Sequence, residues 1–451
     1  MKAKRINFVL FLFFINIGFT YEFSQISEIY QKNVNTNRNL FISSLNNSII
    51  LEWNFTWGGN DNEIATDIVL DSLGNIYITG YANYSFIGNF DIILAKFDSS
   101  GQIQWNRTFG GDGWDSGYDI ALDSNNNIYL AGRIDLSEEP WDSNTDLILV
   151  KYNSLGEFQW NKTCGGEGED TYLGMTLDSV DNIYITGYVS NISDGDYPDL
   201  VVFKYNHLGN HLWNRTWGEH GEDYGLDIVL DSSGNIYLTG QSFDESSGAN
   251  ICLLKYNNLG EFQWKKTWNK SIKHEYGTGI ALDSSENIYI TGITLVDSYP
   301  NYDMVFLKYN ASGALVWNRT WGKKYFDALL DIAIDSEDNI YLAGIVNYST
   351  AKLYDFCLMQ FNINGEQQFN HTWGGIKNDQ CRALTIDSSN NIFLAGYTES
   401  FGSGYIDIYL AKFSKSADKK ESSEIHSYDL SLLILCTILI VGIIIKKKLK
   451  H

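Results

Sequence analysis

Short apolar segments alternate with turn residues along most of the chain. In one representative stretch the apolar segments are 120–123, 128–131, 147–152 and 158–163. β-Branched and aromatic residues fill these segments, and Asp, Asn, Ser and Gly separate them, which is typical of short strands joined by tight turns. We therefore predict a unit of four strands, named a to d in chain order, and an all-β fold.

This four-strand unit occurs seven times. One anchor, Asp-Ile-Ala-Leu-Asp-Ser-x-x-Asn-Ile-Tyr-Ile-Thr-Gly with small variations, covers strands a and b, and a second anchor covers strands c and d. The first anchor recurs every 52 to 55 residues, beginning at Asp67, Asp119, Gly174, Asp227, Gly279, Asp331 and Ala383. Repetition at such a constant spacing indicates a repeat architecture in which neighbouring units pack on one another.

The seventh unit lacks a strand d, and the missing strand lies at the other end of the chain. Unit seven stops after Lys412-Phe413, whereas residues 49–59 carry a strand-d motif with no a, b or c strand before it. In a closed ring, this early strand completes the last sheet and removes an open edge. A linear array would instead need distinct caps, and none is visible. We predict a seven-bladed β-propeller over residues 48–413, closed by an N-terminal strand.

Two hydrophobic segments flank the predicted propeller. Residues 1–20 combine a basic start with an apolar run and are predicted to be a signal peptide, with an uncleaved anchor as the alternative. Residues 429–446 are predicted to form one transmembrane helix, followed by a basic cytoplasmic tail at 447–451. Residues 21–47 and 414–428 are then linkers. The prediction is a single-pass cell-surface protein with the propeller outside, unless the hydrophobic tail is removed during anchoring.

Charge and cysteine usage narrow the classes of partner. The net charge is −23, from 55 acidic and 32 basic residues. A surface this acidic repels nucleic acid and anionic lipid, and it suits cations, sugars, basic partners or solubility alone. The five cysteines are irregularly spaced and form no CxxC motif, so neither a disulfide framework nor a zinc site is predicted.

Two motifs of the unit are similar to those of a known repeat family. They are Leu-Asp-Ser-x-x-Asn-Ile-Tyr-Ile-Thr-Gly and Trp-Asn-x-Thr-Trp-Gly-Gly, within residues 49–413. They resemble the SBBP-type β-propeller repeat of bacterial and archaeal surface proteins, and strands a and b are also similar to NHL propellers. The resemblance implies a propeller fold and export but no defined activity, so no catalytic residue is carried over. Unit four departs from it, because Trp268-Asn269-Lys270 replaces Trp-Gly-Gly and affects one d–a connection.

Aspartate recurs just before strand a. Four of the seven units have it there, as Asp67, Asp119, Asp227 and Asp331. In a closed ring these side chains would gather near the mouth of the central channel, where like charges require a cation or raised pKa values. Ca²⁺ is the candidate cation, although no ordered calcium-loop motif is present. The alternative is that each Asp accepts hydrogen bonds from its own loop.

The second unit has two tryptophans outside the strand-d motif. Trp114 lies in its d–a loop and Trp141 in its b–c loop. With Asp112, Asp115 and Arg133 they are a candidate ligand-binding site for a sugar or a protein partner. The alternative is a local hydrophobic cap on a long loop.

Asn-x-Ser/Thr sequons recur at one position of strand d. In an exported protein these asparagines are candidate glycosylation sites, and the alternative is duplication of a polar strand position. Six units carry them, at Asn54, Asn106, Asn161, Asn214, Asn318 and Asn370.

The sequence carries no recognisable enzyme motif. It contains no nucleophile elbow, HExxH or P-loop, so no catalytic residue is assigned. The first hypothesis is a membrane-anchored recognition or scaffold module for a glycan, a protein partner or a cation. One alternative is an extracellular hydrolase or lyase that acts on a surface polymer through loop carboxylates. The other is a purely structural envelope component.

Overall fold

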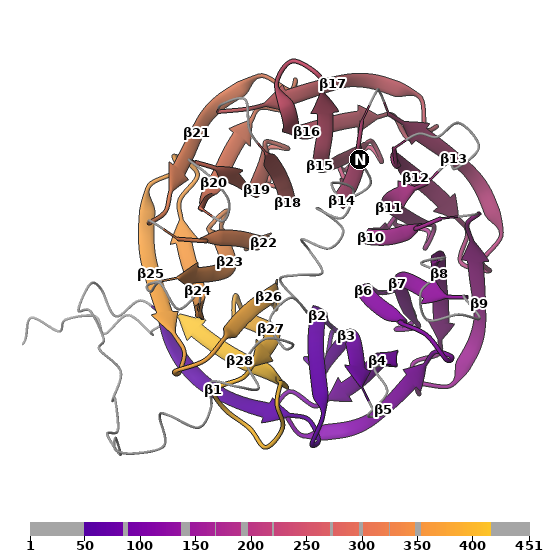
Figure 1. Cartoon of the computed structure of the whole chain (residues 1–451), viewed down its shortest axis with the longest axis vertical. Coiled ribbons are helices and arrows are strands. Elements are labelled where there is room, and N and C mark those ends of the chain that lie inside the picture. Colours follow the sequence, from indigo (N-terminus) through magenta and orange to yellow (C-terminus); the bar gives the residue numbers. More distant parts are fainter. Residues whose placement is uncertain are drawn as a thin grey trace, which may run out of the picture. The chain divides into compact units, whose positions relative to one another are not determined.

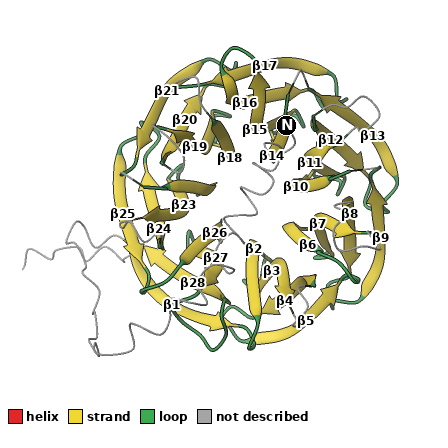
Figure 2. Cartoon of the chain, in the orientation of Figure 1, coloured by secondary structure: helices red, strands yellow, loops and turns green. Residues whose placement is uncertain are grey.

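The protein forms a ring of antiparallel sheets. The computed structural model describes residues 49–83, 89–136, 145–166, 168–190, 197–218, 221–270, 274–296, 301–323, 325–347 and 353–415. Within these ranges, the strands make seven four-stranded sheets that stand around a central axis (Figures 1 and 2). The predicted seven-bladed β-propeller is therefore confirmed.

Several predictions fall on residues outside these ranges. They concern the signal peptide at 1–20, the linker at 21–47, most of the linker at 414–428, the segment from 429 to the end of the chain, and Trp141. Among the described residues, no helix is long and apolar enough to cross a membrane.

Six blades are made of consecutive strands. Blade 1 contains β2 (Asn62–Leu70), β3 (Ile76–Asn83), β4 (Phe90–Phe97) and β5 (Ile103–Phe109). Blade 2 contains β6 (Ser116–Leu122), β7 (Ile128–Asp135), β8 (Thr145–Tyr152) and β9 (Phe158–Cys164). Blade 3 contains β10 (Thr171–Leu177), β11 (Ile183–Val189), β12 (Asp199–Tyr205) and β13 (His211–Trp217). Blade 4 contains β14 (Tyr224–Leu230), β15 (Ile236–Asp244), β16 (Gly248–Tyr256) and β17 (Phe262–Trp268). Blade 5 contains β18 (Glu275–Leu282), β19 (Ile288–Leu295), β20 (Tyr302–Tyr309) and β21 (Leu315–Trp321). Blade 6 contains β22 (Ala328–Ile334), β23 (Ile340–Asn347), β24 (Tyr354–Phe361) and β25 (Gln367–Trp373).

Blade 7 joins the two ends of the described chain. It contains β26 (Asp379–Ile386), β27 (Ile392–Thr398) and β28 (Asp407–Lys415), with β1 (Ile49–Trp57) as its outer strand. The early strand β1 pairs antiparallel with β28 and lies beside it in the ring (Figure 1). The predicted closure by an N-terminal strand is thus observed.

The apolar core lies between blades. In one layer, Ile78 and Ala95 of blade 1 pack with Ala395 and Leu410 of blade 7. Each blade therefore buries its apolar faces against both neighbours, and an array that stayed open would expose two such faces to water.

Two glycines of the repeat are needed for close packing. A Cβ on Gly80 of β3 would lie 1.9 Å from the carbonyl oxygen of Ile64, at the point where strand a bulges. Gly156, in the c–d turn of blade 2, has a φ of +74°, and a Cβ there would lie 2.9 Å from the Trp105 ring of blade 1. The first glycine lets strands a and b approach, and the second lets a strand-d tryptophan pack under the next blade.

The Asp-Ser-x-x-Asn segment forms a capped a–b turn. Asp71 accepts hydrogen bonds from the backbone N–H groups of Leu73 and Asn75, each at 2.9 Å, and from the Asn75 amide at 2.7 Å. Burial acts to raise the pKa of Asp71, but these hydrogen bonds outweigh it and hold the pKa below its ordinary value. The repeated motif is therefore a structural turn, as its composition indicates.

Candidate functional site

The d–a and b–c connections lie at the same end of every blade. Strand a begins at this end and strand b finishes there, and we call it the loop face. The innermost strands β2, β6, β10, β14, β18, β22 and β26 surround the central space (Figure 1). Residues near the start of strand a or the end of strand b therefore stand at the loop-face mouth of the channel.

The four inner aspartates connect neighbouring blades. Each carboxylate accepts a hydrogen bond from a backbone N–H of the next blade. The four donors and distances are Ile120 to Asp67 at 2.9 Å, Met175 to Asp119 at 2.7 Å, Ile280 to Asp227 at 2.8 Å and Leu384 to Asp331 at 2.7 Å. The partner that all four share is thus the next blade. Asp227 and Asp331 also accept from the N–H of the following residue, in line with the alternative that each Asp is bound within its own loop.

These carboxyl groups have raised pKa values. Burial is the main cause at all four, and it raises the pKa of Asp227 to about 7, with the charge of Asp67 adding to the effect. In the described part of the chain, no three His, Cys, Asp or Glu side chains are grouped so that they could share a metal ion. The described residues therefore form no ready-made Ca²⁺ site at this ring, and Ca²⁺ binding there stays a prediction.

The described members of the tryptophan site do not share one exposed surface. Trp114 is half-buried and packs edge-on against Phe90 of blade 1, with 5.3 Å between the ring centroids. Asp112 is exposed, but Asp115 and Arg133 are buried, at 0% and 5% exposure. This arrangement resembles the hydrophobic cap that was the alternative interpretation.

Asp115 holds two connections of blade 2 together. It accepts hydrogen bonds from Gly111 N at 2.6 Å in the d–a loop and from Asp135 N at 2.8 Å at the end of strand b. In blade 6, Asp327 accepts equivalent bonds from Lys323 N and Asn347 N. The same position holds a carboxylate in the other blades, as Glu63, Asp170, Asp223, Glu275 and Asp379. This acidic position is therefore built into the loop face as a structural element.

Arginine and tyrosine side chains gather at the loop-face mouth. We call Tyr81 (β3), Tyr118 (β6), Arg133 (β7), Arg382 (β26) and Tyr397 (β27) the channel cluster. The Arg382 guanidinium lies over the Tyr397 ring, 5.5 Å from its centroid. Burial raises the pKa of Tyr81 and Tyr118, and the charges of both arginines act in the opposite direction at both phenols. Both guanidinium groups are thus near the same two hydroxyl groups.

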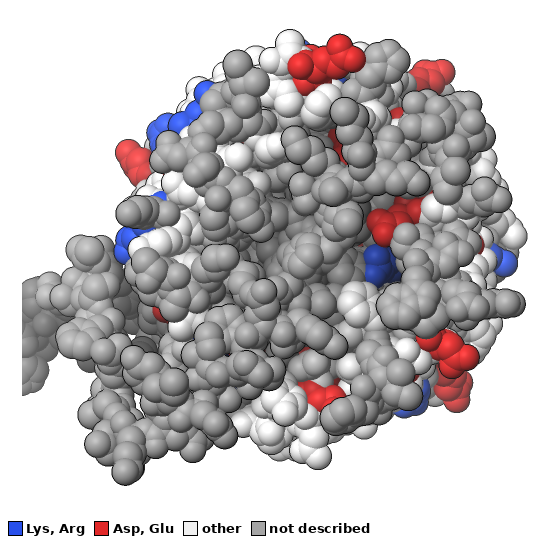
Figure 3. All heavy atoms as spheres, in the orientation of Figure 1, with Lys and Arg blue, Asp and Glu red and all other residues white. Residues whose placement is uncertain are grey.

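The channel cluster is partly accessible. Tyr118 and Arg382 are half-buried, whereas Tyr81 is 4% exposed. Within the described residues, the Tyr81 hydroxyl has no hydrogen-bond partner. Figure 3 shows basic and acidic atoms at the inner edge of this face, over β6 and β10. A ligand that reaches the mouth can therefore meet cationic and hydroxyl donors together.

Aligning the repeats would have pointed to this cluster. The position after the strand-b glycine is Tyr81, Arg133, Tyr188, Gln241, Ile293, Ile345 and Tyr397 in the seven units. Arg382 likewise stands where blade 2 has Tyr118. The variation at these positions was visible in the sequence, but their proximity across blades was not.

A family model for a β-propeller repeat, SBBP, matches residues 57–87 and 273–300. Two segments of the chain therefore match the SBBP β-propeller repeat. The resemblance predicted from the sequence is thereby confirmed at two places along the ring. The matched segments begin at strand d of one blade and before strand a of another, which agrees with the repeat boundaries in the structure.

Two relatives and two solved structures are similar to this SBBP-repeat chain. WD repeat-containing protein L264 of Acanthamoeba polyphaga mimivirus is 24% identical over 39% of this chain, and regulatory protein FlaEY of Caulobacter vibrioides is 26% identical over 22%. The matches span only 15% and 12% of those relatives. The polysaccharide lyase Uly1 has a TM-score of 0.50 at 9% identity, covering 84% of this chain and 94% of that one. A protein from Dyadobacter fermentans DSM 18053 has a TM-score of 0.48 at 9% identity, covering 82% and 100%. At 9% identity, the similarity to Uly1 shows only that the two chains share a fold.

The six strand-d sequons of the SBBP propeller lie on its outer rim. Their asparagines are all exposed, on β1, β5, β9, β13, β21 and β25. Glycans at these positions would surround the ring without covering the mouth of the channel. Glycosylation itself stays a prediction.

Proposed function

We propose that this propeller is a binding module for an acidic glycan, and that the channel cluster is the contact site. The observation that carries the proposal is that Arg382 of blade 7 lies over the Tyr397 ring, and that Arg133 of blade 2 and Arg382 are both near enough to act electrostatically on Tyr81 and Tyr118. A guanidinium group binds a carboxylate or sulfate through paired hydrogen bonds, and tyrosine adds a flat apolar face and a hydroxyl. A sugar that carries an acidic group presents all three complementary features.

Net charge limits the form of this ligand. The chain carries −23 overall, so a long polyanion is repelled as it approaches. The repulsion is screened beyond roughly 8 Å at physiological salt, whereas contacts inside the cluster are screened less. We therefore expect a short acidic oligosaccharide, or the end of a polymer, to bind better than a continuous polyanion.

The proposal places the propeller outside the cell, held by the C-terminal hydrophobic segment with its basic tail in the cytoplasm. Its support is the sequence of the two hydrophobic ends and the exposure of all six rim sequons. The loop face would then meet surface or environmental polysaccharide. Labelling intact cells with an impermeant reagent tests the location, and a chain labelled only after lysis would contradict it.

Arg382→Gln is the direct test of the binding site. We expect it to weaken binding of an acidic oligosaccharide about tenfold or more, because a hydrogen bond to a charged group contributes about 1.5–3 kcal/mol. Calorimetric titration of the full-length chain in detergent, with a uronate oligosaccharide and its neutral counterpart, measures the effect.

Arg319→Gln is the matched control, because Arg319 is exposed on the outer strand β21. It should leave binding unchanged. Equal affinity for the acidic and neutral sugars, or an unchanged affinity in Arg382→Gln, would rule out the channel cluster as the site.

A further inference from the structure

We propose that a divalent cation of the Ca²⁺ type binds where the ring closes, between the carboxylates of Glu63 and Asp407. We call the carboxylates of Glu63 and Asp407, with the nearby backbone carbonyl of Gly59, the closure site. It is distinct from the inner aspartates and from the channel cluster. The proposal rests on the closure of the ring and does not depend on the glycan.

Two buried carboxylates face each other across a glycine. Glu63 of β2 is 3% exposed, and Asp407, the first residue of β28, is 2% exposed. A Cβ on Gly58 would lie 2.4 Å from Asp407 Oδ1 and 2.7 Å from Glu63 Oε2. The two oxygens therefore point toward the same small region, and the absence of a side chain at position 58 keeps it open.

One carboxylate oxygen of the closure site has no donor within the described residues. The Gly59 N–H bonds the Glu63 carboxylate, but Glu63 Oε2 is buried and accepts no hydrogen bond. Asp407 accepts one from Gly404 N at 3.0 Å through its other oxygen, Oδ2. Buried acceptors without donors are costly, and two facing carboxylate oxygens also repel each other. A positive charge between them would remove both penalties.

The surroundings supply further oxygen ligands. The Asp61 carboxylate is near enough to influence Glu63. The carbonyl oxygens of Gly59 and Asp61 lie beside Gly404, whose N–H bonds Asp407 Oδ2, and Gly59 O also accepts from Ser403 Oγ at 3.2 Å. Ca²⁺ takes six to eight oxygens from carboxylates, carbonyls, amides and water. A cavity of about 460 Å³ that Glu63 and Asp61 help to line gives room for water ligands. Since no three acidic, His or Cys side chains are grouped among the described residues, carbonyls, amides and water would complete the coordination shell.

Blade 4 shows how the chain fills the same space with one carboxylate fewer. At the positions of Gly58 and Asp407 it has Asn269 and Asn250, and the Asn269 amide donates a hydrogen bond to Asn250 Oδ1 at 3.0 Å. Glu275 occupies the position of Glu63 there: its Oε1 accepts from Thr294 Oγ1 at 3.0 Å, and its Oε2 is buried in the same way as Glu63 Oε2 but faces the Asn250–Asn269 pair in place of a second carboxylate. A side-chain donor therefore appears together with the loss of one carboxylate. The closure site keeps both carboxylates and has no such donor.

The junction between blades 1 and 2 also has two carboxylates, and its differences from the closure site explain why we propose the cation only at the closure site. Asp115 there is one methylene shorter than Glu63, and both of its oxygens accept backbone hydrogen bonds. At the closure site, the longer Glu63 brings Oε2 over Gly58 with no donor. The cation would link the loop after β1 to β28, and so hold the two ends of the ring together.

Thermal unfolding of the full-length chain with and without Ca²⁺ tests the proposal. We expect Ca²⁺ to raise the melting temperature of the chelator-treated protein by about 4 °C or more, with saturation, because it binds only the folded state. Glu63→Gln should abolish this shift. Tb³⁺ used as a probe should give emission sensitised by Trp57, which lines the same cavity, and Ca²⁺ should displace it.

Two variants serve as matched controls. Glu275→Gln changes the equivalent residue beside the Asn250–Asn269 pair and should keep the full Ca²⁺ shift. The double variant Gly58→Asn with Asp407→Asn copies blade 4 into the closure site, so it should fold and melt at one temperature with or without Ca²⁺. A wild-type protein that shows no Ca²⁺ shift, or a shift that persists in Glu63→Gln, would overturn the proposal.

Discussion

At the scale of single residues, the inner aspartates show why a repeated acid need not be a ligand. Asp67, Asp119, Asp227 and Asp331 each bind a backbone N–H of the next blade, so their repetition follows from blade packing. In the corresponding position, Gly174 leaves no room for a side chain, because a Cβ would lie 2.8 Å from Asp227 Cα. Around part of the ring, aspartate in one blade therefore alternates with glycine in the next, because the glycine positions have no room for a side chain.

These buried carboxyl groups predict a pH dependence of stability. The pKa of Asp227 is raised from its ordinary value to about 7, chiefly by burial, so the folded state holds a proton that the unfolded state has released. The stabilisation is present below the unfolded pKa and is lost as the pH rises through about 7. We expect the melting temperature of metal-free protein to fall by several degrees between pH 5 and pH 8.

Asp227→Asn should flatten this pH profile, since the amide does not titrate and its oxygen can still accept from Ile280 N. Asp98→Asn is the control, because Asp98 lies in the c–d turn of blade 1 and hydrogen bonding lowers its pKa. A profile that is equally steep in Asp227→Asn and in the wild type would contradict the assignment.

At the scale of elements, the c–d turn sets the contact between adjacent blades. Its glycine adopts positive φ and also lies against an aromatic ring of the preceding blade, as at Gly156 and Trp105. Arg107 adds a hydrogen bond from Nε to Gly156 O at 2.7 Å. Turn conformation and packing between blades thus depend on the same residue.

Gly156→Ala should destabilise the propeller by about 1–3 kcal/mol, because a methyl group strains the left-handed backbone and meets the Trp105 ring. Gly111→Ala is the control: no atom lies within 4 Å of the added Cβ. Its effect should stay within about 0.5 kcal/mol. Urea midpoints compare the two, and equal midpoints would show that the c–d turn does not couple the blades.

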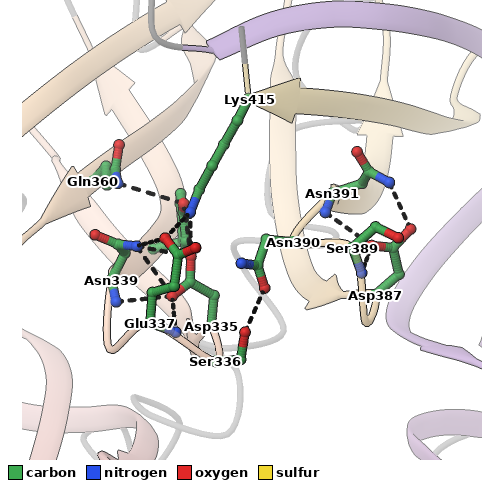
Figure 4. A network of polar contacts seen from close by, with 11 residues as sticks. Asp335, Ser336, Glu337, Asn339, Gln360, Asp387, Ser389, Asn390, Asn391 and Lys415 are labelled. Atoms are coloured by element: carbon green, nitrogen blue, oxygen red, sulfur yellow. Dashed lines mark hydrogen bonds and ion pairs between the residues drawn. The ribbon is translucent and has the colours of Figure 1, made fainter. Parts of the chain in front are cut away.

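At the scale of the whole molecule, the seam between blades 6 and 7 is reinforced by the last described residue of the chain, Lys415. In blade 2, Lys151 of strand c lies 3.6 Å from Asp123 of the a–b turn. Blade 6 has Gln360 in the lysine position, and Lys415 of blade 7 reaches across to Asp335 at 3.0 Å and Glu337 at 2.7 Å (Figure 4). Burial lowers the pKa of Lys415, but its hydrogen bonds to Glu337 and Asp335 outweigh this and raise it.

Lys415→Ala should lower the unfolding free energy by about 1–2 kcal/mol, because it leaves the buried Asp335 without its cation, and the partial exposure of Lys415 limits the loss. Adding Gln360→Lys should restore most of the stability by recreating the arrangement of blade 2. Thermal melts of the wild type, the single variant and the double variant measure both effects. If Gln360→Lys gives no recovery, the lysine position of strand c is not equivalent in blade 6.

The chain's local pattern determined the four strands of each unit, the capped turns, the number of blades and the strand that closes the ring. These features depend on residues close in sequence, whose spacing repeats, and on the single strand left over at the start of the chain, which matches the strand that the last unit lacks. The sequence also showed that Trp114 and Trp141 lie outside the repeated motif, but it did not show that Trp114 packs on Phe90.

Only the tertiary structure decided which side chains meet across blades. Arg133 and Arg382 both act electrostatically on Tyr81, Lys415 replaces the lysine that blade 6 lacks, and Glu63 faces Asp407. These contacts combine residues far apart in the chain, at positions where the units differ, so the repeat gives no rule for them. Glu63 meets Asp407 because the circular order of the blades brings the first and last units side by side.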